Sequence, residues 1–212
     1  MNAHSAGYPR PFVGEKAGRS VDADAGVRAM RRLGDRGDAG PMTTTSTLPA
    51  TGTYTLDPER TAIRCDCKAM FGAFTVHGTL QLSQGQVSID ADPARSSVRA
   101  VIDAQSYSSG NPMRDHDVRS ATLLDTRTYP EISFAGSSAR PDGDGWVVDG
   151  SVTAHGVTQP VALRLREARQ EGGLIRFRAT ATLDRTAFGI TKKKGMVGRA
   201  VTVVIDAVAG PA

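Results

Sequence analysis

The densest group of chemically capable side chains lies between Ser109 and Ser120. The stretch reads Ser109-Gly110-Asn111-Pro112-Met113-Arg114-Asp115-His116-Asp117-Val118-Arg119-Ser120. Its carboxylate, guanidinium and imidazole groups are the types that transfer protons in active sites. The same groups at helical spacing also form ion pairs that fix a capped helix without any catalysis. We favour this structural interpretation and keep the catalytic one as an alternative.

The spacing of the cysteines, lysines and other histidines does not indicate a disulfide, a metal site or an active site. Cys65 and Cys67, two residues apart on a predicted strand, are too far apart and wrongly directed for an easy disulfide. We interpret them as small apolar side chains. Lys192–Lys194 stands in a glycine-bounded loop and is expected to be solvated. The remaining histidines outside the N-terminal segment lack metal-site spacing: His77, His116 and His155. No metal site and no cofactor is predicted.

Composition excludes several classes of protein. The chain has 212 residues, with 26 Lys and Arg against 22 Asp and Glu, a net charge of +4. This excess is too small for nucleic-acid binding by bulk electrostatics. No apolar run approaches the roughly 18 residues that a membrane-spanning helix needs. Two cysteines exclude a disulfide-rich scaffold.

The first 50 residues differ from the rest of the chain. They contain 7 Gly and 4 Pro, and no window keeps a helix or strand period. Such a segment buries too little surface to offset its ordering entropy, so residues 1–50 are predicted to be a disordered tail and linker. No apolar signal-peptide core is present, which favours a cytoplasmic location. A start of translation at Met42 is a second hypothesis.

From residue 51 onward the apolar residues alternate with polar ones. The clearest series is Ile175, Phe177, Ala179, Ala181 and Leu183. This period indicates half-buried antiparallel strands joined by hairpins. The expected strands lie near 53–57, 60–67, 74–82, 86–91, 97–104, 131–139, 145–155, 158–168, 173–184 and 199–208, some merging to give about eight. Residues 51–212 therefore predict an all-β domain, an eight-stranded antiparallel β-barrel.

One or two short helices are expected to interrupt this barrel. The break between 106 and 130 includes 113–121, which is polar and free of glycine. The stretch 68–74 could form a helical turn. Several inward positions carry small residues, which would leave an internal cavity: Ala100, Gly150, Ala154, Ala179 and Ala181. Phe134, Phe177 and Trp146 could instead fill that space, so both a hollow and a solid barrel stay open.

The order of motifs resembles the YceI-like, polyisoprenoid-binding family. The matching stretches are Ser109-Gly110-Asn111, Arg114-Asp115, Val118-Arg119-Ser120, Leu123-Leu124-Asp125, Tyr129-Pro130-Glu131-Ile132-Ser133-Phe134 and the segment from Val148 to Val161 that contains His155-Gly156-Val157-Thr158-Gln159-Pro160. The resemblance extends over residues 53–208. Asp117 stands where the family often has His, and Leu123 and Leu124 replace two Phe. Many members are secreted or periplasmic, whereas this chain shows no signal peptide.

The resemblance implies a lipocalin-like barrel that binds a long isoprenoid chain, such as a polyprenyl quinone or a polyprenyl phosphate, without catalysis. Combined with the alternation, it predicts an apolar channel lined by Phe71, Phe74, Val98, Ala100, Ile102, Phe134, Trp146, Val148, Val161, Leu163, Ile175, Phe177, Ala179 and Val203. Asn111, Arg114 and Asp115 are expected at the rim, near a polar head group. An enzyme acting on a quinone or isoprenoid through residues 111–117, and a protein-interaction scaffold, are the alternatives. The sequence leaves a homodimer open.

Overall fold

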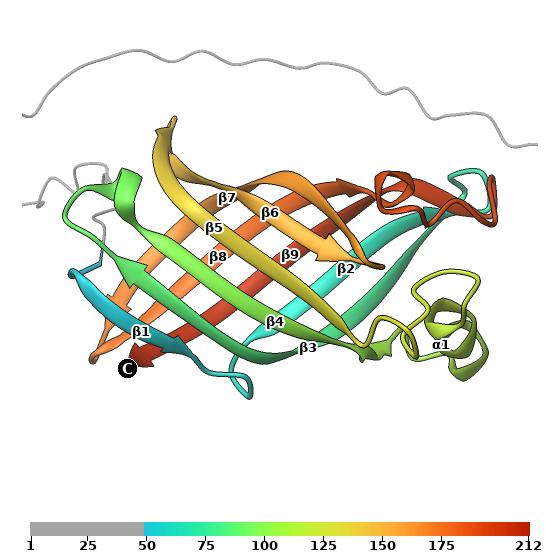
Figure 1. The fold of residues 1–212 in the computed structure, drawn as a ribbon, viewed down its shortest axis with the longest axis horizontal. Coiled ribbons are helices and arrows are strands. Elements are labelled where there is room, and N and C mark those ends of the chain that lie inside the picture. Colours follow the sequence, from blue (N-terminus) through green and yellow to red (C-terminus); the bar gives the residue numbers. More distant parts are fainter. Residues whose placement is uncertain (1–48) are drawn as a thin grey trace, which may run out of the picture. The chain divides into compact units, whose positions relative to one another are not determined.

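Nine antiparallel strands and one α-helix make up the computed structural model, which describes residues 49–212 (Figure 1). The strands are β1 Gly52–Leu56, β2 Ala62–Ala69, β3 Phe74–Ile89, β4 Ser97–Ser108, β5 Glu131–Asp142, β6 Gly145–Ala154, β7 Val157–Glu171, β8 Leu174–Asp184 and β9 Val197–Pro211. The helix is α1 Pro112–Arg119, with 3-10 turns at η1 Pro93–Arg95 and η2 Arg185–Phe188. The tail predicted for 1–50 lies outside the described residues, except for Pro49 and Ala50.

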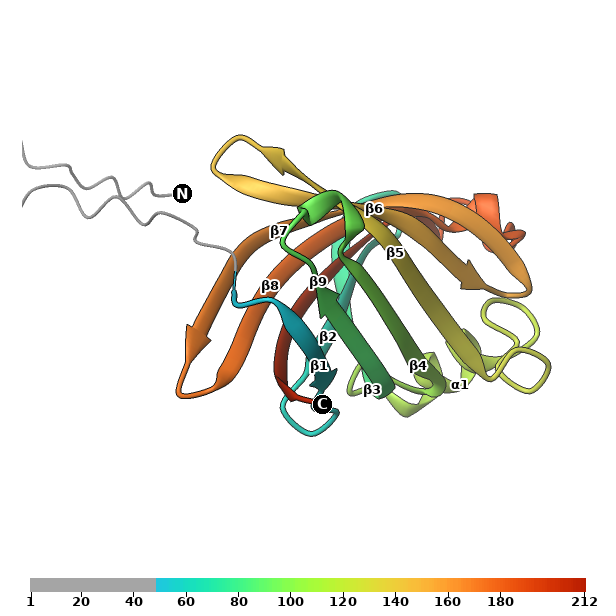
Figure 2. The same ribbon diagram turned by 60° about the vertical axis from the view of Figure 1, so that its left-hand side comes forward.

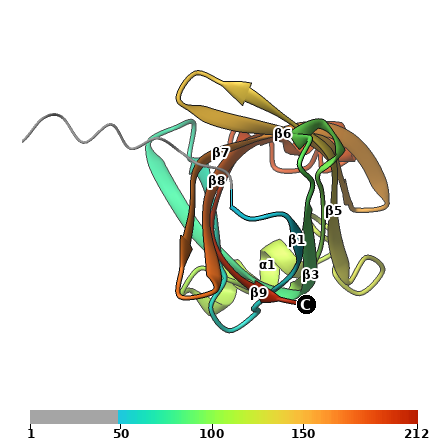
Figure 3. The same cartoon turned by 90° about the vertical axis from the view of Figure 1, so that its left-hand side faces the viewer.

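The strands close into a barrel with eight strand positions. β3 pairs with both β2 and β4, so the sheet has no free edge there. β1 and β2 occupy one position, because each pairs with β3 on one side and β9 on the other. Viewed along its axis, the barrel is a closed ring (Figure 3). This confirms the predicted eight-stranded antiparallel barrel.

Alternating burial explains why these sequences form strands. In β8, Phe177 and Ala179 face the interior, while Arg178 lies outside and donates to Asp206 at 2.6 Å. The expected strands 74–82 and 86–91 are one strand, β3. No turn separates the two ranges, because Gly85 pairs with Ala100 after a register shift. A Cβ at Gly85 would lie 2.5 Å from the Leu56 side chain, so this glycine makes room for β1.

The helix α1 forms where residues 113–121 predicted one. Asn111 caps its first turn, its side chain accepting from the amides of Met113 and Arg114 at 3.1 Å each. The helical turn considered for 68–74 is wrong. Met70 and Phe71 have positive φ angles of 51° and 56°, and the Gly72 amide donates to the Ala69 carbonyl at 3.0 Å. With a second hydrogen bond from the Ala73 amide to the Met70 carbonyl at 3.1 Å, these residues form a four-residue hairpin loop between the paired Ala69 and Phe74.

The two ends of the barrel are built differently. We call the end formed by α1, the β2–β3 turn and segment 185–196 the helix end (Figures 1 and 2). The turns β3–β4, β5–β6 and β7–β8 form the opposite end. There, Tyr54 and Leu56 of β1 pack with Ile89, Ile175 and Ala209 in a buried cluster. No helix among residues 49–212 is long and apolar enough to cross a membrane.

Candidate functional site: the barrel cavity

A cavity of about 680 Å³ lies inside the barrel, and every strand contributes to its wall. This volume falls within the roughly 300–1,000 Å³ typical of small-molecule sites. Phe134 and Phe177 line the cavity but leave it unfilled. Twelve of the residues predicted from the sequence line it: Phe74, Val98, Ala100, Ile102, Arg114, Phe134, Val148, Val161, Leu163, Phe177, Ala179 and Val203.

Small residues account for much of the space, with one exception. Ala100, Ala154, Ala179 and Ala181 line the cavity, as their alternation predicts. Gly150 does not line the cavity, because the backbone of β5 occupies the space that its missing side chain leaves. A Cβ there would lie 2.4 Å from the Ala135 carbonyl oxygen, where β5 and β6 approach closely beside a register shift.

Three predicted wall residues lie outside the cavity lining. Phe71 is 89% exposed, because it occupies the centre of the β2–β3 turn. Ile175 faces inward but is fully enclosed by the cluster around Leu56. Trp146 stands at the start of β6, in the β5–β6 hairpin that extends beyond the barrel wall (Figures 2 and 3).

Two of the three predicted rim residues organise the helix rather than the cavity. Asn111 is the N-cap of α1. Asp115 is buried and accepts from the Ser109 hydroxyl at 2.6 Å and the Ser109 amide at 2.8 Å. These hydrogen bonds hold the pKa of Asp115 below its ordinary value. Arg114 alone of the three lines the cavity.

The charged residues of the lining gather at the helix end. Among the described residues they are Lys68, Arg114, Asp117, Arg185 and Lys193, four cations and one anion. Towards the opposite end the lining consists of uncharged residues such as Ser96, Ser97 and Ala139. The cavity is therefore apolar along its length and positively charged at one end.

An ion pair and three hydrogen bonds position three of these charged side chains. Asp117 of α1 accepts from the Lys193 ammonium of the segment 185–196, so an ion pair joins the two sides of the helix end. The buried guanidinium of Arg185 donates to three backbone carbonyls, those of Gly198 at 2.7 Å, Ile190 at 2.5 Å and Val197 at 2.9 Å. Because these acceptors are neutral, the positive charge of Arg185 is not cancelled by them.

Sequence reasoning missed part of the lining. Asp117, Arg185 and Lys193 lie outside the strands, where no alternation shows which way a side chain points. On the strands, a signal was available. Leu80 and Leu82 alternate with Thr79 and Gln81, and both leucines line the cavity: this is the same period-two pattern that identified β8.

The thiols of Cys65 and Cys67 also line the cavity. Burial raises the pKa of Cys65 to about 12, and the neighbouring Asp66 and Cys67 add to this effect. Burial likewise raises the pKa of Cys67. Because the thiolate is the nucleophile, both groups are poorly suited to nucleophilic chemistry at neutral pH. They act as small apolar wall residues.

None of the three described histidines lines the cavity, and two of them make contacts that serve packing or ion pairing. His77 contacts Asp66 at 2.7 Å on the outside of the barrel, and His155 packs against Tyr129 with ring centroids 4.8 Å apart. His116 is exposed on α1 and does not line the cavity. Within residues 49–212 no three His, Cys, Asp or Glu side chains come together as a metal site would require.

Comparisons with known proteins match this barrel. The family model of the YceI-like domain matches residues 54–209. A UPF0312 protein of Pseudomonas putida is 33% identical over 161 residues, covering 72% of this chain and 82% of its own length. Protein YceI of Escherichia coli O157:H7 is 29% identical over 137 residues, covering 62% and 72%.

Solved structures show the same fold. Burkholderia cenocepacia BcnA superposes with a TM-score of 0.66 at 24% identity, covering 72% of this chain and 98% of that one. A polyisoprenoid binding domain from Saccharophagus degradans, implicated in plant cell wall breakdown, gives a TM-score of 0.56 at 14% identity, covering 75% and 98%. Because the family model spans most of the chain and agrees with these relatives, this protein belongs to the YceI-like family.

Proposed function

We propose that the barrel binds and carries a long-chain isoprenoid lipid, with the chain in the cavity and the polar head at the helix end. The observation that carries this proposal is the distribution of charge along the lining. The long apolar wall suits a hydrocarbon chain, while Arg114, Arg185 and Lys193 suit an oxygen-rich head group. The polyisoprenoid binding of the Saccharophagus degradans domain supports the same class of ligand.

Transfer of the chain from water to the cavity supplies the binding free energy. Each buried methylene contributes about 0.8 kcal/mol, before the cost of ordering the chain. Four cations against one anion at the helix end favour a polyprenyl phosphate over a neutral polyprenyl quinone. The protein acts by sequestering the lipid, and no bond needs to be made or broken.

The catalytic alternative receives less support. Of the proton-transferring groups in 111–117, His116 faces solvent and Asp115 is engaged by Ser109. Asp117 lines the cavity, where it is paired with Lys193. A binding role needs only the cavity and its charged end. Full isoprenoid binding by a His116→Ala variant, with no product formed by the unmodified protein, would favour carriage over catalysis.

Ala179→Phe tests the proposal, because it inserts a ring into the cavity. Displacing about three methylenes of the bound chain would weaken the affinity for geranylgeranyl phosphate roughly fiftyfold. Ala162→Phe is the matched control, since Ala162 lies on the exposed face of β7. Native mass spectrometry gives the bound fraction, and thermal unfolding checks the fold. Equal binding by both variants would contradict the proposal.

A further inference from the structure

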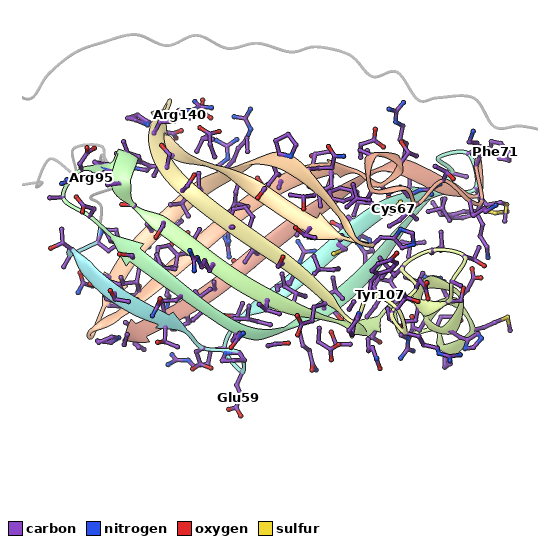
Figure 4. The ribbon with its side chains drawn as sticks, viewed as in Figure 1. Glu59, Cys67, Phe71, Arg95, Tyr107 and Arg140 are labelled. Carbon is purple, nitrogen blue, oxygen red and sulfur yellow. The ribbon has the colours of Figure 1, made fainter. Side chains whose placement is uncertain are left out.

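The helix end carries an exposed apolar surface. Among residues 49–212, the large hydrophobic side chains that stand exposed are Met70, Phe71, Phe74, Met113 and Met196, and all of them lie at this end. We call these five residues the apolar rim. Phe71 is labelled at this extremity in Figure 4, and Met113 of α1 is 83% exposed. Exposed apolar surface concentrated in one place marks an interaction site.

The backbone holds part of this rim outward at a conformational cost. The first two positions of the β2–β3 turn have positive φ angles, which favour Gly, Asn or Asp because a larger side chain is crowded there. Here the positions are taken by Met70 and Phe71, two bulky residues. The turn is held by the segment 185–196: the Phe71 amide donates to the Gly195 carbonyl at 2.7 Å, and the Met70 amide donates to the Met196 carbonyl at 3.1 Å.

The Phe71 ring lies over Gly195, where a Cβ would come within 2.5 Å of the ring. One face of the ring thus packs on Gly195, and the rest of the side chain is exposed to solvent. Bulky residues in a strained turn that contribute nothing to the buried core indicate a function for their exposure.

Two lysines stand beside one part of the apolar rim. Lys192 and Lys194 are exposed beside Met196 and make no ion pair within the described part of the chain. The nearby acids are already engaged: Asp117 with Lys193, and Asp184 with Arg199 at 2.6 Å. The surface therefore combines aromatic and methionine side chains with unneutralised positive charge, the combination that binds anionic lipid headgroups and the acyl boundary beneath them.

We propose that the helix end docks onto an anionic lipid bilayer, with the apolar rim inserted at the interface and Lys192 and Lys194 against the headgroups. This inference rests on the proposed function and extends it. Met70, Phe74 and Met196 belong both to the rim and to the cavity lining, so docking joins the cavity to the acyl region. An isoprenoid chain then moves between bilayer and barrel without crossing water.

The charge pattern argues against a second copy of the chain as the occupant. A two-fold dimer through this end would bring the same patch from both copies together, lysines included. An anionic membrane neutralises those lysines, whereas a symmetric partner adds like charges.

Flotation of the full chain with lipid vesicles tests the proposal. We expect binding to vesicles of phosphatidylcholine mixed with phosphatidylglycerol, weak binding to phosphatidylcholine alone, and loss of binding at high salt. Reversing two lysines, Lys192→Glu with Lys194→Glu, should lower the bound fraction about tenfold. Phe71→Ser with Met113→Ser should lower it by a similar factor. The matched control is Arg99→Glu with Arg166→Glu, which changes net charge equally at exposed positions of β4 and β7 away from the rim.

Parallel titration with geranylgeranyl phosphate in vesicle-free buffer separates docking from ligand binding. Isoprenoid binding without vesicle binding by the unmodified protein would overturn the docking proposal and leave the proposed function standing. Vesicle binding without isoprenoid binding would overturn the proposed function and leave the docking to the bilayer standing. Equal flotation of the rim variants and the control variant, or self-association through the rim in place of vesicle binding, would also overturn docking.

Discussion

The two ends of the barrel differ in how their interior is filled and in which side chains they expose. At the opposite end, Tyr54, Leu56 and Ile175 fill the interior, and the nearby cavity wall is uncharged. At the helix end the strands give way to α1 and the segment 185–196, which bring charge to the lining and leave apolar side chains exposed. One end thus contributes packing and the other contributes recognition, and an amphipathic ligand has only one favourable orientation between them.

The largest effect on binding is expected from a charge placed between the two ends. Leu163→Asp puts a carboxylate on the apolar wall, and burying it beneath a hydrocarbon chain costs about 3 kcal/mol or more, roughly a hundredfold in affinity. Titration with geranylgeranyl phosphate followed by calorimetry measures this loss. Ala162→Asp, on the exposed face of the same strand, serves as the control and should bind normally. Unimpaired binding by Leu163→Asp would mean that the chain lies elsewhere.

A smaller effect is expected from removing charge at the helix end. The double variant Arg114→Gln with Lys193→Gln should lose about tenfold in affinity for geranylgeranyl phosphate, because each of these partly exposed cations contributes about 0.2–1 kcal/mol to an ion pair. The affinity for geranylgeraniol, which is neutral, should change by no more than about threefold, the effect expected from loss of the Lys193–Asp117 ion pair alone.

The control for this charge removal lies at the opposite end, in Arg95→Gln with Arg140→Gln. If these substitutions weakened phosphate binding as much as those at the helix end, the proposed orientation would be reversed or lost.

The smallest effect concerns the ion pair between Asp117 and Lys193. Both side chains are partly exposed, and such pairs contribute about 0.2–1 kcal/mol. Asp117→Ala should therefore speed the release of geranylgeraniol only about threefold, as followed by stopped-flow fluorescence. Asp142→Ala breaks a comparable pair with Arg164 towards the opposite end and should leave the release rate unchanged. Identical release from both variants would show that the Asp117 pair does not restrain the helix end.

The wall of the cavity and Arg114 at its rim could be predicted from the sequence, whereas the rest of the charged end could not. Val161, Leu163 and Phe177 follow a period of two, and closure of the sheet turns that period into an inner face. Arg185 and Lys193 lie outside the strands, where direction depends on contacts such as those of the Arg185 guanidinium with backbone carbonyls.

The errors at Phe71 and Gly150 have separate physical causes. Phe71 lies just beyond the end of β2, where the turn geometry replaces strand alternation and points the ring outward. Gly150 has the inward position that its period predicts, but the close approach of β5 uses its lack of a side chain. Composition and spacing cannot distinguish a glycine that opens a cavity from one that admits a neighbouring backbone.

A crystal structure of the protein grown with geranylgeranyl phosphate tests the central claim most directly. The account predicts continuous electron density along the cavity beside Leu163 and Phe177, with the phosphate within hydrogen-bonding distance of Arg114 or Lys193. A phosphate bound beside Ser96 and Ser97, or a ligand found only on the outside of the barrel, would contradict it.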